Sequence, residues 1–368
     1  MDLRIWRHFD FPLLLCALVL VGIGMAMIYS ATWGGEPGLP TDDSIYRQAI
    51  YAAGGLVLMW VAIVVDYRLL GTVAWPFYVL TLALLVLVLV NGQSSYGAQR
   101  WLDLGIIPLQ PSELAKIAVV LTLARYLARH ESEIGRFRHV LGSLAILALP
   151  AGLILAQPHL GSVVVLAVVW GSMMLVAGIR WLHVLFLGLI AGVASPAVWM
   201  LLPDYQHDRV LQFFDQGAAD PLGADYNIRQ ALISIGSGGF WGRGYLSGTQ
   251  SQLHFLRVRH TDFIFSVLAE ELGFVGACVL LGLFLFLLWR ALRVVALSQD
   301  TFGRLVAVGV ISYIMFQAFI NIGMNVRLLP VVGMPLPFVS AGGSALITAL
   351  ACIGLLESIV MRHKRLEF

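Results

Sequence analysis

The sequence predicts an all-α integral membrane protein with about ten transmembrane helices. Of its 368 residues, 59% are hydrophobic and only 12% are charged, which leaves too little polar surface for a soluble globular protein. Apolar runs also recur at about 20 residues, the length of a helix that crosses about 30 Å of hydrocarbon. The net charge of +2 indicates no basic surface for nucleic acid, so no nucleic-acid partner is expected.

Hydropathy sets the limits of the ten predicted spans. The first apolar run follows Arg4 and Arg7, but its length and the lack of a small-residue cleavage site predict a retained helix and not a signal peptide. Cys16, Cys278 and Cys352 each lie in an apolar run without a partner at disulfide or metal-ligand spacing, which is typical of packing residues. The spans cover residues 11–31, 47–65, 70–90, 112–128, 139–156, 159–179, 182–202, 263–289, 304–325 and 341–361.

Basic residues concentrate in alternate connections between these spans, which predicts the orientation. The short connections of the other set hold little beyond Arg47, Arg100 and Arg327. The positive-inside rule therefore places both termini in the cytoplasm and the active face outside. We expect one domain, 1–368, with a large extracytoplasmic loop, 203–261, between the seventh and eighth spans.

This long outer loop is predicted to be folded and functional. Loops beyond about 12–15 residues are usually functional or disordered, and this one mixes aromatic residues with a helix-like segment at 228–235. Its glycine-rich run, 236–244, can turn tightly and approach a ligand closely. It lacks the Lys-Ser/Thr step of a Walker phosphate loop. The alternative is a packed surface loop with glycine turns.

The fourth span opens with a polar motif that ends in an ionisable pair. Pro111 suits the first turn of a helix, and Glu113 there is favoured by the helix dipole. Glu113 and Lys116 are spaced i, i+3 and can pair. Lys116 lies about one turn inside an apolar helix, where a cation is costly unless it is paired or faces water. The pair is either structural, locking two helices together, or functional.

Residues 328–344 form a third outer feature. Three prolines, Pro330, Pro335 and Pro337, forbid a continuous helix. Non-helical backbone at membrane depth is tolerated where protein buries it or water reaches it, so we expect this segment to line the same outer cavity. Ser340 and Ser344 are predicted to cap the last helix.

Asp262 is the acid around which these features are expected to converge. It is the one carboxylate at the mouth of the eighth span and follows the charged stretch that begins at Arg259. At about 100° per residue, Glu270 lies about 80° from Asp262 and Glu271 almost opposite it. The three acids cannot all line one site, and we rank the two glutamates below Asp262.

The polar motifs together resemble the SEDS family (shape, elongation, division and sporulation). They come in the expected order and cover nearly the whole chain, and those at 101–105 and 248–252 favour its elongation branch. They are residues 100–105 (RWLDLG), 110–113 (QPSE), 235–239 (IGSGG), 248–252 (GTQSQ), 260–265 (HTDFIF), 269–273 (AEELG) and 335–344.

The resemblance implies a peptidoglycan glycosyltransferase of the bacterial cytoplasmic (inner) membrane that polymerises lipid II for cell elongation and rod shape. A class B penicillin-binding protein is implied as its transpeptidase partner, together with other members of the elongation complex. The essential acid is then Asp262, and Glu113 with Lys116 match positions also needed for activity. Four positions at three places depart from the family pattern: Arg257-Val258 replaces a Pro-Glu step, His159 replaces an Asp, and Ala341 replaces an aromatic residue.

The chemistry of the residues fits an inverting glycosyl transfer with a diphosphate leaving group. Such a transfer needs a base on the acceptor hydroxyl and charge stabilisation on the diphosphate, without a covalent nucleophile. Asp262 is the candidate base, or else the ligand of a divalent cation, Mg²⁺ or Mn²⁺; no other cofactor is indicated. The candidate diphosphate ligands are Arg100, Lys116, Arg209, Arg243 and Arg259. Further residues expected to support substrate binding are Trp101, Gln110, Ser112, Gln250, Gln252, His260, Thr261 and Ser340.

Two other classes compete with the enzyme. A flippase would carry lipid II across the membrane, but such transporters keep charges near the midplane and show repeat symmetry, and no internal repeat is obvious here. An inert scaffold for the transpeptidase gives no reason for an exposed acid among arginines. The sequence therefore favours the glycosyltransferase.

Overall fold

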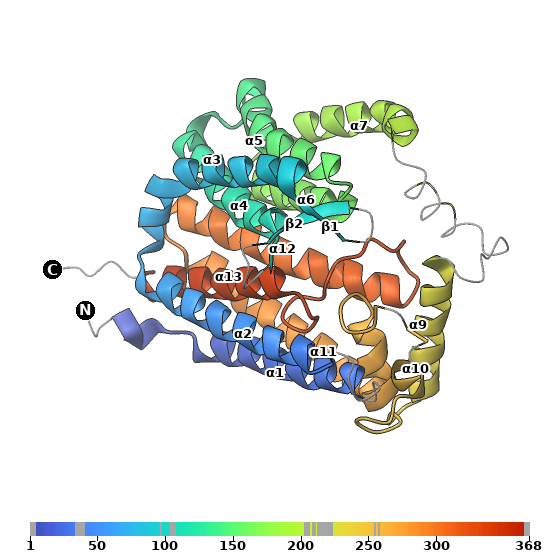
Figure 1. Ribbon diagram of the computed structural model, residues 1–368. Helices are drawn as coiled ribbons and strands as arrows, with labels where there is room; N and C mark the ends of the chain where they lie inside the picture. Colours follow the sequence, from blue (N-terminus) through green and yellow to red (C-terminus); the bar gives the residue numbers. More distant parts are fainter. Residues whose placement is uncertain are drawn as a thin grey trace.

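The computed structural model describes residues 5–33, 41–95, 98–103, 108–201, 207, 211, 224–253, 255–256 and 258–363. Figure 1 shows a bundle of long helices with one small sheet. The α-helices are α1 (Phe11–Thr32), α2 (Thr41–Val64), α3 (Tyr67–Asn91), α4 (Pro111–Arg129), α5 (Phe137–Ala156), α6 (Leu160–Ala177), α7 (Trp181–Leu201), α9 (Ala224–Gly238), α10 (Thr249–Gln252), α11 (Ile264–Leu297), α12 (Thr301–Asn325) and α13 (Gly343–Met361), and two 3-10 helices are η1 (Ile5–His8) and η2 (Glu131–Glu133).

A long helix covers each of the ten predicted spans, which confirms the all-α class. Eight of them are long and apolar enough to cross a membrane: α1, α2, α3, α5, α6, α11, α12 and α13. Helix α4 is not apolar enough to be counted with these eight, because charged side chains, Glu113 and Lys116 among them, interrupt its apolar sequence. Among the described residues of α7 the apolar stretch is Trp181–Ile190, which is shorter than a membrane-spanning helix. The number of spans, ten, stays a prediction.

A small antiparallel sheet in the connection between α3 and α4 was not predicted. Its strands are β1 (Gln93–Ser95), β2 (Ala98–Asp103) and β3 (Pro108–Leu109), in the order β1-β2-β3. Leu102 pairs with Leu109 across β2 and β3. Strands of two to six residues are too short for an alternating pattern to stand out in a sequence. The sheet fixes where Arg100 and Trp101 lie.

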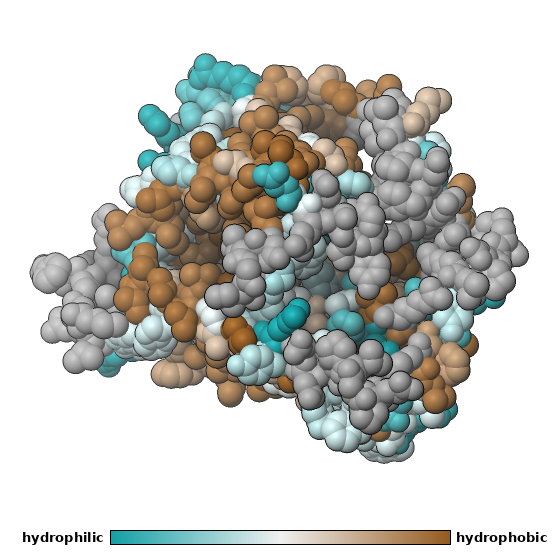
Figure 2. Space-filling model, in the orientation of Figure 1, coloured by the Kyte–Doolittle hydropathy of each residue, from teal (hydrophilic) through white to brown (hydrophobic). Residues whose placement is uncertain are grey.

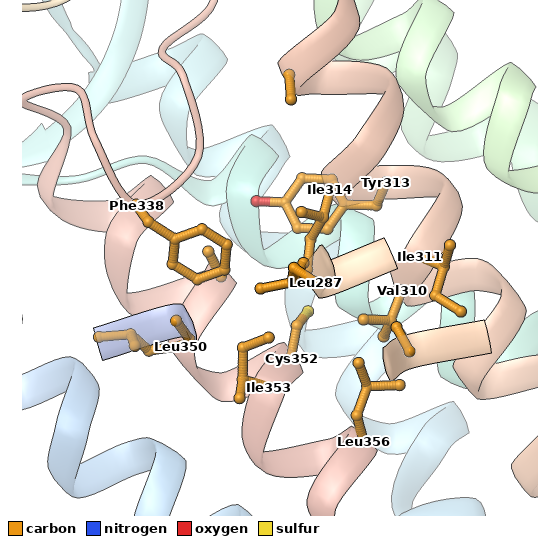
Figure 3. Packing of buried hydrophobic residues seen from close by; sticks show 14 of the residues in the cluster. Leu287, Val310, Ile311, Tyr313, Ile314, Phe338, Leu350, Cys352, Ile353 and Leu356 are labelled. Carbon is orange, nitrogen blue, oxygen red and sulfur yellow. The ribbon is translucent and has the colours of Figure 1, made fainter. Parts of the chain in front are cut away.

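The core of the bundle lies among α11, α12 and α13. Figure 3 shows Leu287 of α11, Val310, Ile311 and Ile314 of α12, and Ile353 of α13 packed together. Buried residues make up 94% of the most apolar stretch of α13 but only 28% of that of α3. Helix α13 is therefore central, and α3 is peripheral.

Close packing of α13 on α2 depends on small residues. A Cβ on Gly354 would lie 2.4 Å from the carbonyl oxygen of Met59, and a Cβ on Gly343 would lie 2.3 Å from the ring of Tyr51. A larger side chain at either position would push the two helices apart.

The surface carries apolar side chains that a soluble protein would bury. Val57 of α2 and Val79 and Leu80 of α3 are more than half exposed, and Figure 2 shows brown, hydrophobic residues gathered over these helices. Large exposed apolar surface of this kind faces lipid. The chain is an integral membrane protein.

The first and last described segments lie together at one end of the bundle. The rings of His8 and His363 are 4.7 Å apart, and Asp10 at the start of α1 pairs with Arg290 at 2.6 Å. At the other end of α1, the Arg259 side chain donates to the carbonyl oxygen of Ala31. Figure 1 shows β1, β2, α9 and α10 toward this second end. We call the two ends the terminal end and the loop end.

Candidate active site

Asp262 lies in the turn formed by residues 258–263, directly before α11 at the loop end. Its carbonyl oxygen accepts two hydrogen bonds from α12, from Asn321 Nδ2 at 3.0 Å and from Asn325 Nδ2 at 2.9 Å. Both asparagines are completely buried, whereas Asp262 is half-buried. The backbone that carries the acid is therefore fixed while its side chain lies near the surface.

The proline-rich segment 330–342 meets the same turn, in agreement with the sequence prediction that the two lie together. Ser340 Oγ donates to the carbonyl oxygen of Thr261 at 2.5 Å and accepts from the amide of Leu336 at 2.8 Å. The amide of Ala341 donates to the carbonyl oxygen of His260 at 2.9 Å. The turn is thus held from two sides, by α12 and by this segment.

The predicted capping role of Ser340 and Ser344 is wrong. The N-cap of α13 is Gly342, and no side chain bonds there. The Ser344 hydroxyl instead donates to the carbonyl oxygen of Pro108 at 3.4 Å and accepts from the amide of Gln110 at 3.0 Å. Both hydroxyls join separate segments because polar backbone groups of non-helical chain lie within their reach.

Glu113 and Lys116 form the predicted ion pair, at 2.7 Å. The two side chains are only 2% and 1% exposed. Lys116 Nζ also donates to Gln317 Oε1 of α12 at 2.9 Å and lies 4.9 Å from the ring centre of Tyr313. The pair therefore joins α4 to α12, and its burial keeps Lys116 from contacting a ligand in this conformation.

A polar stripe on α12 connects this ion pair to Asp262. Its members, Tyr313, Gln317, Asn321 and Asn325, follow at intervals of four residues and so share one face of the helix. Gln317 Nε2 and Asn321 Nδ2 donate to the carbonyl oxygens of Pro335 and Met334, at 2.9 and 2.7 Å. Sequence reasoning missed this stripe, although four polar residues at that spacing in an apolar helix were a visible signal.

The glycine-rich run 236–244 packs against a break in α11. Gly273 interrupts that helix with φ 67° and ψ −165°, and Gly242 has φ +83°. A Cβ on Gly242 would lie 2.1 Å from the carbonyl oxygen of Glu271. The amides of Arg243 and Gly244 donate to the carbonyl oxygens of Glu270 and Glu271, each at 3.0 Å. Close packing on α11 therefore explains why a glycine stands at position 242. This agrees with the alternative prediction of a packed surface loop with glycine turns.

Glu270 and Glu271 are buried and hold the outer loop in place. Glu270 Oε1 accepts from the amide of Gln250 at 2.9 Å and from Thr249 Oγ1 at 3.2 Å. Glu271 Oε2 accepts from the amide of Leu246 in the loop at 3.4 Å, and its Oε1 accepts from the hydroxyl of Ser30 on α1. Both glutamates therefore have a structural role, and their rank below Asp262 in the chemistry stays a prediction.

The side chains of Arg243 and Gln252 also fold the outer loop onto itself. Arg243 donates to the carbonyl oxygen of Ser237 at 3.2 Å and to Thr249 Oγ1 at 3.1 Å. Gln252 donates to the carbonyl oxygen of Leu246. These two candidates lie with Gln250 beside α11, one helix turn or more beyond the Asp262 turn.

The remaining candidates are spread around the loop end. Arg100 on β2 donates to the carbonyl oxygens of Gln157, at 3.3 Å, and Pro158, and Trp101 beside it is half-buried. The Ser112 hydroxyl is buried without a hydrogen-bond partner among the described residues. Arg209 lies outside the described residues.

Two basic residues, Arg259 and His260, lie three and two positions before Asp262. Arg259 is half-buried and donates to the carbonyl oxygen of Ala31 on α1. Burial, and then the neighbouring Arg259 charge, lowers the pKa of His260 below its ordinary value. His260 therefore takes up a proton less readily than a free imidazole does.

The donors near Asp262 do not form a protein-only metal cage. No group of three or more His, Cys, Asp and Glu side chains is placed to hold a metal ion within the described parts of the chain. A single carboxylate suits Mg²⁺ or Mn²⁺ where substrate phosphates supply further oxygens.

Comparison with known proteins identifies the family. Residues 11–365 match the FtsW/RodA/SpoVE family, described as cell cycle protein. The chain belongs to the SEDS family. Among its relatives is the peptidoglycan glycosyltransferase MrdB of Escherichia coli K12, which is 42% identical over 361 residues, 98% of this chain and 95% of MrdB.

Two solved structures share the fold. The rod shape determining protein RodA of Thermus thermophilus is 31% identical, with a TM-score of 0.72 over 98% of this chain and 99% of RodA. A chain from a study of how a peptidoglycan synthase complex coordinates polymerization and crosslinking is 32% identical, with a TM-score of 0.82 over 96% of this chain and 98% of the other. The expected family and fold are thereby confirmed.

Proposed function

We propose that this protein is a peptidoglycan glycosyltransferase that polymerises lipid II for cell elongation and rod shape. The observation that carries the proposal is the anchoring of the Asp262 turn, whose carbonyl oxygens accept hydrogen bonds from α12 and from Ser340 while the acid stays half-buried. A reacting group needs such fixed geometry, because a misplacement of about 1 Å costs about 100-fold in rate. The 42% identity to MrdB supports the same activity.

Asp262 is the proposed general base. In an inverting transfer it takes the proton of the acceptor sugar hydroxyl while that oxygen bonds to the anomeric carbon of the donor. The bond from this carbon to the diphosphate breaks in the same step, and the diphosphate leaves with the electron pair. One carboxylate suffices because no covalent glycosyl intermediate forms.

Arg259 is the arginine best placed to stabilise the leaving diphosphate. It lies three residues before Asp262, is half-buried, and uses its Nε for Ala31. The guanidinium keeps further N–H groups that can bind phosphate oxygens bidentately. Arg100 and Arg243 have the same chemistry but lie on β2 and beside α11, so they are assigned to the parts of the substrate away from the reacting carbon.

Lys116 and Glu113 are proposed to position the site and not to touch the diphosphate. Both are nearly inaccessible, and their contacts run through Gln317 to the carbonyl oxygen of Pro335. Pro335 belongs to the proline-rich segment 330–342, which also contains Ser340, and the Ser340 hydroxyl holds the Asp262 turn. The ion pair acts on the acid through these neighbours.

A divalent cation, Mg²⁺ or Mn²⁺, would fit only where Asp262 and the diphosphate oxygens share it, since the protein offers one carboxylate in this turn. When bound, it would neutralise charge on the leaving diphosphate.

The proposed location is the bacterial inner membrane, with both termini in the cytoplasm and the loop end outside. The proposed partner is a class B penicillin-binding protein whose transpeptidase domain cross-links the glycan strands. The similarity to a chain from a peptidoglycan synthase complex supports this pairing.

The function is tested with purified protein, lipid II and no ATP, by separating the products on a gel. Wild type with its partner is expected to form polymer, and Asp262→Asn to form none. The control is Glu131→Gln, a carboxylate replaced at the terminal end, where Glu131 contacts Thr301; it should polymerise like wild type. Equal polymer from wild type and Asp262→Asn, or none from wild type, would overturn the proposal.

A further inference from the structure

A basic pocket at the terminal end has no part in the proposed reaction. It lies where α3 begins, α4 ends and α12 begins, on the opposite end of the bundle from Asp262. Its volume is about 410 Å³. Arginines from two helices line it, and its lining residues are Arg68, Gly71, Arg125, Ala128, Arg129, Asp300 and Phe302.

The pocket carries more positive than negative charge. Its one carboxylate, Asp300, is already occupied, since one oxygen accepts from the Tyr67 hydroxyl and the other from the amide of Gly303 at 2.9 Å. Arg68 interacts electrostatically with Asp300 and with Asp66 beside the pocket, but no ion pair within 4 Å joins Arg125 or Arg129 to a carboxylate among the described residues. Three guanidinium groups thus share a pocket with a single engaged acid, an arrangement suited to an anion.

The arginines differ in how firmly the protein holds them. The guanidinium of Arg125 is half-buried and donates to the carbonyl oxygen of Gly71, which fixes it on α3. Arg68 lies against the ring of Tyr67, at 5.5 Å from its centre, and Arg129 is exposed. One fixed and two adaptable guanidiniums can surround a tetrahedral phosphate, each offering paired N–H donors.

The position of the pocket favours a phosphate carried by a lipid. Leu69 and Val73 of α3, beside the lining residues Arg68 and Gly71, are 59% and 49% exposed, as expected of side chains that face acyl chains. Basic pockets between helices at a membrane surface bind anionic lipid headgroups. A headgroup in this pocket would leave its acyl chains along α3.

We propose that Arg68, Arg125 and Arg129 bind the phosphate group of an anionic phospholipid from the leaflet at the terminal end. A free phosphate ion offers the same chemistry, so the test must separate the two sources.

The test is native mass spectrometry of the full chain in detergent with added phosphatidylglycerol, phosphatidylcholine or inorganic phosphate. Phosphatidylglycerol should bind in preference to phosphatidylcholine, and millimolar inorganic phosphate should not displace it. Arg68→Gln with Arg129→Gln should weaken phosphatidylglycerol binding about 30-fold, and Arg129→Gln alone about fivefold, at about 1 kcal/mol per arginine. Both arginines are exposed, so the variants should elute from a sizing column like wild type.

The matched control is Arg293→Gln, which removes an exposed arginine of α11 that does not line the pocket. It should bind phosphatidylglycerol like wild type. Equal binding of the two lipids, unchanged binding by the double variant, or an equal loss in Arg293→Gln would overturn the proposal. Arginine-dependent binding of inorganic phosphate that displaces the lipid would assign the pocket to a soluble anion instead.

Discussion

Replacing Lys116 with Met should destabilise the protein because it leaves Glu113 buried without its counter-charge. Glu113 is 2% exposed, its bond to Lys116 is 2.7 Å long, and its other contact, with the Tyr313 hydroxyl, is a long 3.5 Å. Removing one partner of a buried pair costs about 3–5 kcal/mol, most of it the penalty of the charge that stays behind. Gln317 also loses the donor to its side-chain oxygen.

A second substitution should recover much of this loss. With Glu113→Gln added to Lys116→Met, no charge stays buried, and we expect the double variant to be more stable than the sum of the two single effects by about 2 kcal/mol. The free energy of unfolding is measured by SDS titration of the purified protein in micelles. The control is Arg136→Met, which breaks an exposed ion pair with Glu133 and should change stability little.

Additive effects would contradict the expected coupling between Glu113 and Lys116. If the single variants sum to the double variant within about 0.5 kcal/mol, Glu113 and Lys116 do not stabilise one another. A Lys116→Met protein as stable as wild type but unable to polymerise lipid II would instead give Lys116 a direct role with substrate.

Three further predictions concern the loop end. Asn325→Leu removes a hydrogen bond to the carbonyl oxygen of Asp262 and should lower the free energy of unfolding by about 1–3 kcal/mol. In the lipid II assay it should change the turnover number more than KM, because the reacting acid is displaced. An unchanged turnover number would contradict the positioning role of Asn325. Gly242→Ala should prevent folding because its Cβ would overlap the backbone of α11, whereas Gly236→Ala, which has open space, should elute from a sizing column like wild type. Because the pKa of His260 is lowered in the folded protein, this imidazole takes up a proton at a higher pH in the unfolded chain than in the folded one. The free energy of unfolding should therefore decrease as pH drops below about 6.5. His260→Gln should weaken that dependence in melting curves between pH 5 and pH 8, and an identical dependence would exclude His260 as its source.

Much of the helical architecture could be predicted because lipid requires long apolar helices. Each predicted span matches a helix, but some limits differ: the eighth was predicted to end at 289 and continues in α11 to Leu297. There the charged residues Arg290 and Arg293 ended the hydropathy signal. Arg290 lies inside the helix because Asp10 neutralises it, a long-range contact that the local sequence does not reveal.

The sequence could predict the acid of the candidate site, but not the hydrogen bonds that hold the backbone of this acid in place. Asp262 could be recognised as an isolated carboxylate at a helix mouth, and Glu113 with Lys116 as a pair by spacing. The hydrogen bonds from Asn321 and Asn325 join residues about 60 positions apart in sequence. Ser340 likewise looked like a cap because spacing to the next helix is visible in a sequence, whereas a bond to the carbonyl oxygen of Thr261 is not.

The central place of α13 constrains the order in which the protein can assemble. This helix packs against α2, which lies far earlier in the chain, with Gly354 on the backbone of Met59 and 94% of its most apolar stretch buried. Until α13 has entered the membrane, the helices that pack on it surround a slot that lipid or a chaperone must fill. The bundle can close only once α13 is in the membrane, so a chain cut before Gly343 would leave α2, α11 and α12 without the helix on which they pack.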